Sequence, residues 1–392
     1  MNEKELLKLS EGMKEYTCTN YRNLHRIPET AHHEIKTNAY IRARLDELGI
    51  AYWTPAENIT IAHIENGEGL TIGLRADTDA LPVQEETGLE FSSQHEGVMH
   101  ACGHDAHTSI VLNAARLLNE NRDLWKGTVK VIFQPAEEGE PGADEVIATG
   151  LINDVDLFFG NHVWSPHKTG ELHVSPVVVS AAVDMFTLTV NGKGGHGAIP
   201  EKCNDSVVAA SAIVMALQTI VSRKSSPMEP IVLTIGSFNA GNVGNIIAPQ
   251  AVLKGTLRTL SNEMHEEMLS AVESMAKSVA SAYGCTAELE NRFISGALKN
   301  DEQLSEIARK CAVELVGEDK VFPEYTMMLG DDFANYGRIA PICYVQVGIA
   351  DEAKQTAYAH HNCRFKMDED MLPVASAWMA SCAVRAAGEW HK

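Results

Sequence analysis

The stretch Leu70–Ala76, with the sequence LTIGLRA, is an almost uninterrupted apolar run, and it stops at the polar triplet Asp77–Asp79 (DTD). A strand with one face in water would alternate apolar and polar residues. This stretch lacks that alternation, which predicts burial on both faces, as in parallel sheets that are covered by helices. The stretch therefore favours an α/β fold.

Two further apolar strands end in side chains that can bind a metal ion or exchange a proton. Val129–Phe133 (VKVIF) is followed by Gln134–Gly139 (QPAEEG), and Leu157–Gly160 (LFFG) is followed by Asn161-His162. In open α/β sheets, ligands bind beyond the carboxyl ends of the strands. The recurrence predicts a catalytic domain with a helix-covered, mostly parallel sheet whose strand ends carry the functional site.

The densest group of such side chains is Met99–His107 (MHACGHDAH), which holds three histidines, a cysteine and an aspartate in nine residues. The side chains of Cys102 and His104 can face one ion if the chain turns sharply between them. Gly103 permits that turn because glycine lacks the Cβ that forbids most backbone conformations. An amphipathic helix is expected to follow, from residue 105 to 119. The stretch predicts half of a metal site at the start of a helix.

The chain of 392 residues is longer than the roughly 250–300 residues that a single core organises. From about residue 181 the buried strands give way to four alternating strands and two helices, a pattern typical of a small α+β unit. After Gly296 the first pattern returns. We therefore expect a catalytic metal-binding domain formed by residues 1–180 and 296–392, with an inserted lid or dimerisation domain at 181–295.

The overall charge limits the classes of partner. A net charge of −21 argues against nucleic acid as a partner, because nucleic acid requires clustered Lys and Arg. No apolar run reaches the roughly 18–20 residues of a membrane span.

The cysteines and the first residues bear on the compartment. The eight cysteines are scattered and form no CxxC pair, as in reducing compartments, and the first few residues lack the apolar core of a signal sequence. These features predict a cytoplasmic protein that binds any anionic substrate through a few local cations.

Five side chains at strand ends and in loops are candidate metal ligands. Sulfur, imidazole and carboxylate together favour a transition-metal ion, because magnesium and calcium prefer oxygen ligands alone. Five ligands are one more than a tetrahedral zinc ion takes, which allows two ions that share a ligand. The residue types do not choose between His360 and His361. The candidates are Cys102, His104, Glu138, His162 and His361.

The adjacent pair Glu137-Glu138 is interpreted as having two tasks. We assign Glu138 as a metal ligand and Glu137 as the general base, which takes a proton from the attacking water and returns it to the leaving nitrogen. Most other histidines are interpreted as structural. His100 and His107 are interpreted as supports for the loop and for the start of the helix.

Four runs of sequence resemble those of the M20 metallopeptidase superfamily. Within it they are similar to the amidohydrolase branch, which includes hippurate hydrolases, N-acyl-amino-acid amidohydrolases and hydrolases of indoleacetic acid–amino acid conjugates. The resemblance implies two divalent ions, Zn²⁺ or Mn²⁺, a catalytic α/β domain, and an inserted α+β lid through which two copies form a homodimer. The runs are Leu24–Glu29 (LHRIPE), Leu74–Pro82 (LRADTDALP), Met99–His107 and Phe133–Glu138 (FQPAEE).

Carried over by position, the resemblance assigns a role to each residue of the predicted site. Glu137 matches the general base, and Asp79 matches an acidic residue that orients the site. The spacing to Phe365 and to Asp368–Asp370 selects His361 over His360. The metal ligands fall on Cys102, His104, Glu138, His162 and His361.

Three residues of the predicted lid also match the branch. His196, in a Gly-Gly-His-Gly-Ala-x-Pro run, resembles a histidine that polarises the scissile carbonyl, often from the partner subunit. Asn245 and Arg258 resemble contacts to the carboxylate of the substrate. An arginine fork suits that task because its two N–H groups match a carboxylate.

The sequence departs from the branch at two places. Residues 330–333 read Gly-Asp-Asp-Phe where the branch usually has Ser-Glu-Asp-Phe, and Asn362-Cys363 stands where Ser-Pro or His-Pro is usual. Both are expected near the pocket, so the branch's substrate preferences are not carried over to this chain.

The function that we expect is a metal-dependent amidohydrolase that cleaves N-acyl or N-aroyl amino acids into a carboxylic acid and a free amino acid. The alternative is a dipeptidase or aminopeptidase of the same superfamily, which would need a pocket for a free α-amino group. A third hypothesis, a metal-dependent binding protein without catalysis, is disfavoured because the base Glu137 is intact.

Overall fold

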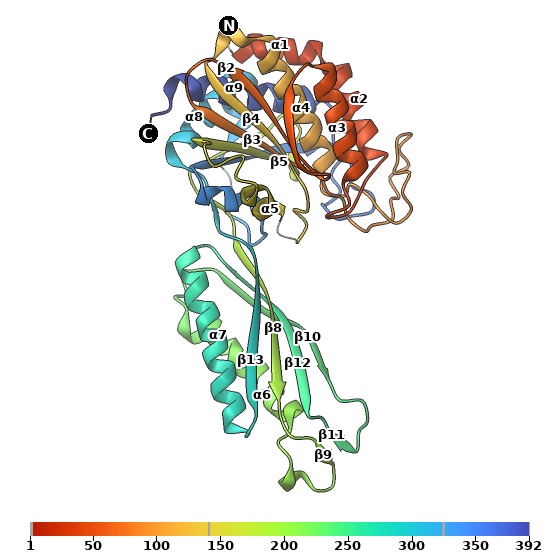
Figure 1. Cartoon of the computed structure of the whole chain (residues 1–392), viewed down its shortest axis with the longest axis vertical. Coiled ribbons are helices and arrows are strands. Elements are labelled where there is room, and N and C mark those ends of the chain that lie inside the picture. Colours follow the sequence, from red (N-terminus) through yellow and green to blue (C-terminus); the bar gives the residue numbers. More distant parts are fainter. Residues whose placement is uncertain (1–2, 140–141, 324–325, 392) are drawn as a thin grey trace. The chain divides into compact units, whose positions relative to one another are not determined.

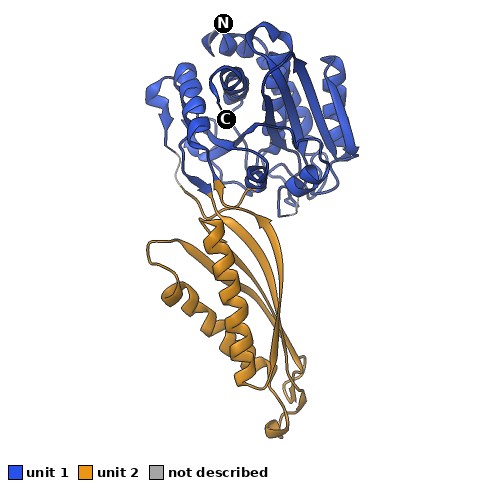
Figure 2. Cartoon of the chain, turned by 60° about the vertical axis from the view of Figure 1, so that its left-hand side comes forward, with its two compact units in different colours: residues 1–179, 299–325, 332–392 blue, residues 180–298, 326–331 orange. Residues whose placement is uncertain are grey.

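The structure is a computed structural model that describes residues 3–139, 142–323 and 326–391. The chain forms two compact units, which Figure 2 shows in different colours. Unit 1 comprises Met1–Val179, Lys299–Tyr325 and Asp332–Lys392, and unit 2 comprises Ser180–Leu298 and Thr326–Asp331. Each unit has its own core of buried apolar side chains. The short return of the chain into unit 2 at Thr326–Asp331 was not expected from the sequence.

Unit 1 contains an eight-stranded sheet in its described residues, in the order β1-β2-β4-β3-β5-β16-β6-β15. Figure 1 labels β2, β4, β3 and β5 of this sheet. The neighbouring pairs among β4, β3, β5 and β16 are parallel, whereas β1, β2 and β4 pair antiparallel. The predicted mostly parallel sheet is therefore confirmed. The strands are β1 (Ala51–Ala56), β2 (Ile59–Asn66), β3 (Thr71–Asp77), β4 (Gly127–Gln134), β5 (Leu157–Lys168), β6 (Leu172–His173), β15 (Val321–Phe322) and β16 (Ile342–Ala350).

Helices cover this sheet, as its buried strands require. α4 and α9 pack on each other and on β3 and β5, while α5 packs against β4. Two successive helices, α1 and α2, lie near the N-terminus, because the chain turns at Met13. The helices of unit 1 are α1 (Glu3–Gly12), α2 (Lys14–His25), α3 (Ile35–Glu47), α4 (His104–Glu120), α5 (Gly142–Ala148), α8 (Glu302–Val316) and α9 (Met371–Glu389).

Unit 2 is an antiparallel sheet with two helices, the α+β pattern expected from the sequence. Its strands follow the order β10-β12-β8-β13, and α6 and α7 pack on each other and on the sheet. The short strands pair β9 with β11 and β7 with β14. The bounds are β7 (Val178–Ser180), β8 (Ala182–Asn191), β9 (Gly195–His196), α6 (Ser206–Thr219), β10 (Ile231–Ala240), β11 (Ile246–Ile247), β12 (Gln250–Thr259), α7 (Asn262–Ala282), β13 (Thr286–Ser295) and β14 (Leu298–Lys299).

Candidate metal centre

The register of the sheet brings the functional loops of unit 1 to one edge. Asp77 at the end of β3 lies opposite Gln134 at the end of β4, and Arg75 lies opposite Gly160 of β5. The prediction that the third strand ends at Gly160 is wrong. β5 continues to Lys168 because β16 pairs with it, so His162 lies inside the strand.

The turn between Cys102 and His104 has the geometry that the sequence predicted. Gly103 precedes α4 with a φ of 95°, in the left-handed region. A Cβ atom at this position would lie 2.4 Å from Cγ2 of Val163. The turn therefore requires glycine both for its backbone conformation and for space.

The structure groups the five candidate ligands into two sets of three that share Cys102. One set is Cys102, His104 and His162, and the other is Cys102, Glu138 and His361; within each set, one ligand atom from each residue lies within 4.8 Å of the others. Sγ of Cys102 lies 3.4 Å from Nε2 of His162, and Nε2 of His361 lies 3.3 Å from Oε1 of Glu138. Two adjacent ions bridged by one thiolate fit this arrangement.

Two candidate ligand atoms are buried without a hydrogen bond in the part of the chain that the structure describes, which is the strongest sign that the residues fit a metal. Nε2 of His104 and Oε1 of Glu138 have no hydrogen-bond partner among the described residues. An unpaired buried polar atom costs about 1–3 kcal/mol, which a coordinated ion would offset. Nδ1 of His104 lies 3.2 Å from Oδ1 of Asp79, so the imidazole can donate there and keep its Nε2 lone pair for an ion.

The protonation states of the ligands follow from their burial. Burial raises the pKa of the Cys102 thiol well above its usual value, and burial lowers the pKa of His162 well below its own. Burial disfavours the charged form of His104 too, but the carboxylates of Asp77 and Asp79 outweigh it and raise the pKa of His104. The buried thiol of Cys102 can lose its proton only if a cation lies next to it. A divalent metal ion would supply that positive charge and would replace the protons that the thiol and the imidazoles otherwise hold.

His360 and His361 differ in how their nitrogens are used. Nε2 of His360 accepts a hydrogen bond from the backbone N–H of Ser165, and its ring stacks on Trp164 with centroids 4.6 Å apart. His361 adopts a φ of 64°, donates its backbone N–H to the carbonyl of Ala101, and turns Nε2 toward Glu138. The geometry favours His361 as the ligand.

His107 and His100 lie beside the cluster. Nδ1 of His107 donates to Asp77 (2.7 Å), and Nε2 accepts the backbone N–H of Val163 (2.9 Å), which leaves no lone pair for an ion. Both ring nitrogens of His100 are buried without a hydrogen-bond partner in the described part of the chain, and burial lowers its pKa to about 4. His100 is therefore a neutral, space-filling neighbour of the loop.

Two buried carboxylates hold the loop of Glu137 and Glu138. The backbone N–H groups of Glu137 and Glu138 donate to Oδ1 and Oδ2 of Asp79, at 3.1 and 3.0 Å. The preceding N–H, of Ala136, donates to Oε1 of Glu34 at 2.9 Å, and Ala136 has a φ of 55°. Asp79 thus contacts both the loop and His104, and its role in orienting the catalytic site stays a prediction. Glu34 was missed, because nothing in the sequence links it to a loop 102 positions away.

A second network that the sequence did not show lies under the site. Arg75 donates to Asp77 (2.5 Å), to Asp332 (2.8 Å) and to the side-chain oxygen of Gln134 (2.9 Å), and all four side chains are buried. Asp332 belongs to the run that departs from the family pattern. Asp332 anchors the strand ends beneath the candidate metal cluster, and the expectation that its run lies near the substrate pocket stays a prediction.

His25 also has a larger role than the sequence suggested. Its Nδ1 lies 2.7 Å from Oδ2 of Asp105 and its Nε2 lies 3.3 Å from Oε1 of Glu85. Burial opposes its charge, but the two carboxylates outweigh burial and raise the pKa of His25 to about 9. A protonated His25 therefore ties α2 to the first turn of α4. Its place in the run Leu24–Glu29 was the available signal.

The three predicted substrate contacts lie in unit 2. His196 on β9 pairs with Ile246 on β11, and Gly197 donates its N–H to the carbonyl of Asn245, so His196 and Asn245 lie in neighbouring loops. Arg258 on β12 is half-buried and donates to the carbonyl of Met328. Their contact with substrate stays a prediction.

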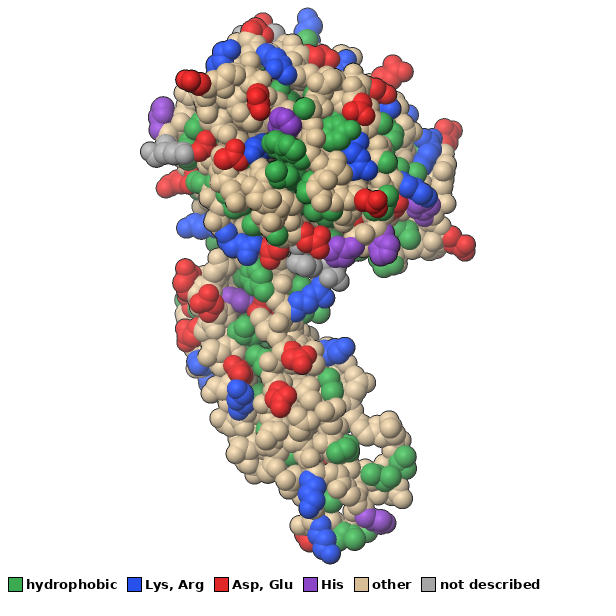
Figure 3. Space-filling model, in the orientation of Figure 1, with side chains coloured by type: hydrophobic (Ala, Val, Ile, Leu, Met, Phe, Trp, Pro, Cys, Tyr) green, Lys and Arg blue, Asp and Glu red, His purple; other side chains and the backbone are tan. Residues whose placement is uncertain are grey.

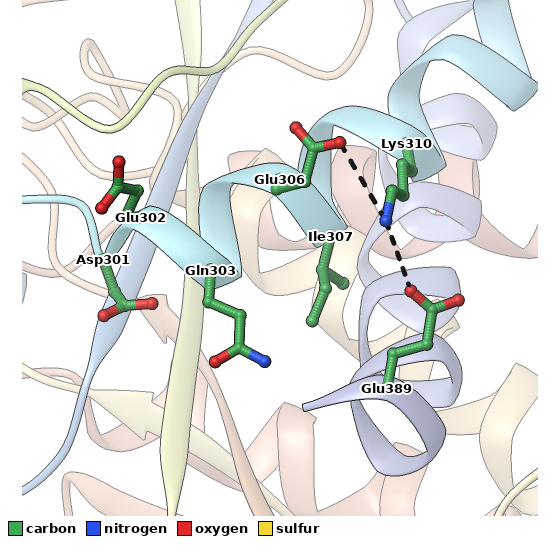
Figure 4. A pocket seen from close by; sticks show the side chains of 7 residues that line it. All are labelled: Asp301, Glu302, Gln303, Glu306, Ile307, Lys310 and Glu389. Atoms are coloured by element: carbon green, nitrogen blue, oxygen red, sulfur yellow. Dashed lines mark ion pairs between the residues drawn. The ribbon is translucent and has the colours of Figure 1, made fainter. Parts of the chain in front are cut away.

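A hollow of about 520 Å³ lies elsewhere in unit 1, between α8 and the end of α9 (Figure 4). Lys310 lies there between Glu306 and Glu389, at 4.0 and 3.7 Å. The seven lining residues include neither histidine nor cysteine. This hollow is therefore a poor candidate for the metal centre.

Comparison with known proteins agrees with the geometry. Residues 73–384 match the family described as Peptidase family M20/M25/M40. The chain is 38% identical over 366 residues to N-acetylcysteine deacetylase of Bacillus subtilis (93% of this chain, 94% of that one). It is 32% identical over 371 residues to IAA-amino acid hydrolase ILR1-like 5 of Arabidopsis thaliana (93% and 85%).

A solved structure extends this comparison. The YXEP protein of Bacillus subtilis, described as a dinuclear metal binding peptidase from the M20 family, superposes with a TM-score of 0.84 at 32% identity and covers 96% of this chain and 99% of its own. The relatives named here are hydrolases that act on amide bonds. The chain belongs to peptidase family M20/M25/M40, as an amide-bond hydrolase of its amidohydrolase branch.

Proposed function

We propose that this enzyme hydrolyses the amide bond of N-acyl or N-aroyl amino acids to a carboxylic acid and a free amino acid. The observation that carries the proposal is the pair of ligand sets that share Cys102 and lie beside the carboxylate of Glu137. The named substrates of the relatives, N-acetylcysteine and an indoleacetic acid–amino acid conjugate, are both acylated amino acids.

In this proposal, Cys102, His104, Glu138, His162 and His361 hold two divalent ions, Zn²⁺ or Mn²⁺. Bound ions of this kind activate water and polarise the amide carbonyl. The ligand types support a transition metal, because thiolate and imidazole are poor ligands for magnesium and calcium. Asp79 keeps His104 in the tautomer whose Nε2 is free to coordinate.

In this proposal, Glu137 transfers a proton from the attacking water to the leaving nitrogen. Its Oε2 lies 3.8 Å from Nε2 of His104, and its side chain is mostly buried, at 11% exposure, so it borders the ligand cluster. As general base it takes a proton from the attacking water, and as general acid it then delivers that proton to the amide nitrogen as the C–N bond breaks. Asp79 accepts a hydrogen bond from the backbone N–H of Glu137, which holds the Glu137 side chain at the edge of the ligand cluster.

Unit 2 supplies the substrate contacts in this proposal. Arg258 and Asn245 bind the carboxylate of the amino-acid product, and His196 polarises the scissile carbonyl. The half-buried guanidinium supports the role of Arg258, since burial lowers the pKa of Arg258 and an anion would compensate for that burial. A chain with a net charge of −21 needs such a local cation for an anionic substrate.

The homodimer through unit 2 and the cytoplasmic location belong to the same proposal. Figure 3 shows apolar side chains, in green, on the surface of unit 2. The exposed apolar residues of this unit include Val208 (48% exposed), Met215 (71%) and Ile246 (57%). The segment Ser206–Lys224 is long and apolar enough to cross a membrane by length and composition alone, and we assign its exposed face to a second copy of the chain. All eight cysteines are free, which supports a reducing compartment.

The test is Glu137→Gln in enzyme loaded with metal, assayed on acetyl, benzoyl and indoleacetyl amino acids. We expect kcat to fall by about 10²–10⁴-fold while the metal content stays unchanged, since the variant removes a base and no ligand. Glu120→Gln, at the exposed end of α4, is the matched control and should keep full activity. Full activity of Glu137→Gln would disprove the role of the base. Faster cleavage of glycyl than of acylated substrates would instead favour the dipeptidase alternative.

A further inference from the structure

The ligands of the candidate metal centre come from loops that are far apart in the sequence. His104 begins α4, whereas His361 lies in the loop that precedes α9. His104 belongs to one ligand set and His361 to the other. The spacing of two bound ions therefore depends on how these two loops are held relative to each other. Such sites need their ligands within about 0.5 Å of the productive geometry, which hydrogen bonds from neighbouring residues secure.

His25, the last residue of α2, contacts one carboxylate through each nitrogen of its ring. Nδ1 lies 2.7 Å from Oδ2 of Asp105, and Nε2 lies 3.3 Å from Oε1 of Glu85. An ionised carboxylate only accepts hydrogen bonds, so a ring that donates to both of them carries two protons. All three side chains are 4% exposed or less. The imidazolium is therefore a rigid, charged link between two buried carboxylates.

The first of these carboxylates leads to His104. Asp105 directly follows His104 in the sequence, and its Oδ1 accepts the backbone N–H of Ala106 at 2.9 Å. Its carbonyl accepts the hydroxyl of Ser109 at 2.8 Å. The contact from His25 to Oδ2 of Asp105 therefore holds the first turn of α4, which carries the ligand.

The second carboxylate leads to the loop of His361. Oε2 of Glu85 accepts the backbone N–H of Ser93 at 2.6 Å, which holds this segment of the chain against itself. The next residue, Glu86, donates its backbone N–H to the carbonyl of Cys363 at 2.8 Å. Cys363 follows His361 by two positions. His25 is thus connected to both ligand loops, to each through one carboxylate residue.

The charges of this link support one another. Burial opposes the charge of Glu85, but hydrogen bonds from His25, Thr87 and Ser93 outweigh burial and lower the pKa of Glu85 to about 2. Removing one partner of a buried ion pair leaves an uncompensated charge. Without the imidazolium, Glu85 and Asp105 would also repel each other, so the two segments would move apart.

We propose that His25 is a positioning residue of the metal centre, which holds the loops of His104 and His361 so that two ions can share Cys102. It touches neither an ion nor the substrate, and it acts through the two carboxylates that it contacts. This inference rests on the metal centre of the proposed function, and it is independent of which acylated amino acid is cleaved. Loss of a group that orients metal ligands lowers metal affinity by about 10–100-fold.

The first test compares His25→Gln with wild type. Metal-free full-length protein is titrated with Zn²⁺, and bound zinc is measured against free zinc. Glutamine is neutral and has a single terminal donor group, so it cannot link both carboxylates, and we expect half-saturation to need about 10–100-fold more free zinc. His265→Gln is the matched control, because His265 is 4% exposed and its Nε2 lies 3.1 Å from Oδ2 of Asp184 in unit 2. This control should lower the melting temperature and leave zinc affinity unchanged.

The titration also separates this inference from the proposed function. If wild type binds two ions and His25→Gln binds them with equal affinity while its melting temperature falls, His25 is only structural and the inference alone is overturned. If wild type binds no zinc, the proposed metal centre and this inference fail together.

Glu85→Gln provides the second test, and decides the matter if His25→Gln does not fold. The amide fills nearly the same space as the carboxylate but lacks the charge that pairs with the imidazolium. We expect about tenfold weaker zinc binding and, at a Co²⁺ concentration that saturates wild type, a weaker thiolate-to-metal band, because both ligand sets share Cys102. Glu90→Gln, at an exposed position of the same segment, should change neither. Wild-type zinc affinity and an unchanged band in Glu85→Gln would overturn the proposal.

Discussion

The metal cluster of unit 1 and the substrate loops of unit 2 are built in opposite ways. In unit 1 the supporting side chains of Asp79 and His107 are hydrogen-bonded, whereas Nε2 of His104 and Oε1 of Glu138, two candidate ligand atoms, are buried without a hydrogen bond among the described residues. In unit 2, His196 is exposed and its Nδ1 only accepts a local N–H, that of Ala198. The first region is preorganised for an ion, whereas the second is held by short-range turns. Changes in unit 1 should therefore act on metal binding and kcat, and changes in unit 2 on KM.

Loss of the shared thiolate should have the largest effect. Cys102→Ser removes the one ligand that both sets contain. Loss of a residue that only supports a ligand lowers metal affinity by up to about 100-fold, so we expect a larger loss of affinity here, with activity falling in parallel. Metal content after dialysis measures this directly. Cys311→Ser, at a fully buried thiol in α8, is the control for burying a hydroxyl. The bridging role fails if Cys102→Ser retains two ions per chain.

Asp79→Asn should have the next largest effect. One amide oxygen cannot replace two carboxylate oxygens that accept from Glu137 and Glu138 and also orient His104. We expect metal affinity and kcat to fall by about 10–100-fold, the range for groups that orient ligands. Asp123→Asn, outside the site, should change neither. A change in KM alone would show that Asp79 does not act through the ligand shell.

Arg258→Gln should have a smaller effect, confined to binding. Losing a charged hydrogen bond at a half-buried site costs about 1.5 kcal/mol, or about tenfold in KM for acylated amino acids. Substrates whose carboxylate is blocked as an amide should be cleaved equally by wild type and variant. Lys254→Gln removes the same charge from an exposed position on the same strand. If it raises KM equally, the effect belongs to overall charge and not to Arg258.

This contrast also separates what the sequence predicts from what it does not. Local patterns nominated most of the candidate ligands: Glu138 and His162 follow apolar runs, and Gly103 marks the turn between Cys102 and His104. The choice of His361 over His360 came from the family resemblance. The length of β5 was not predictable, since it depends on pairing with β16 far along the chain. The network around Arg75 was hidden for the same reason, because its partner Asp332 lies 257 positions away. Local sequence patterns therefore point to candidate ligands, whereas the residues that support them by hydrogen bonds depend on pairing between distant parts of the chain.

Glu34 sharpens the comparison with Asp79, because both carboxylates hold the same loop and only one touches a ligand. Burial raises the pKa of Glu34 to about 7, with the charge of Asp79 as a further cause. The folded state therefore binds more protons at Glu34 than the unfolded state, whose pKa is 4.5. By linkage, the contribution of the Glu34 carboxyl to the free energy of unfolding is fully present below pH 4.5, and it is lost as the pH rises through about 7.

Glu34→Gln keeps an acceptor oxygen for the N–H of Ala136 and cannot ionise. We expect its effect on kcat to be smaller than that of Asp79→Asn. Its melting temperature relative to wild type should increase between pH 5 and pH 8, because only wild type must bury a charge at the higher pH. Glu145→Gln, at a half-exposed carboxylate in α5, should show no such trend. A constant difference across this range would mean that Glu34 stays ionised in the fold, and that the loop is held by two charges instead of one.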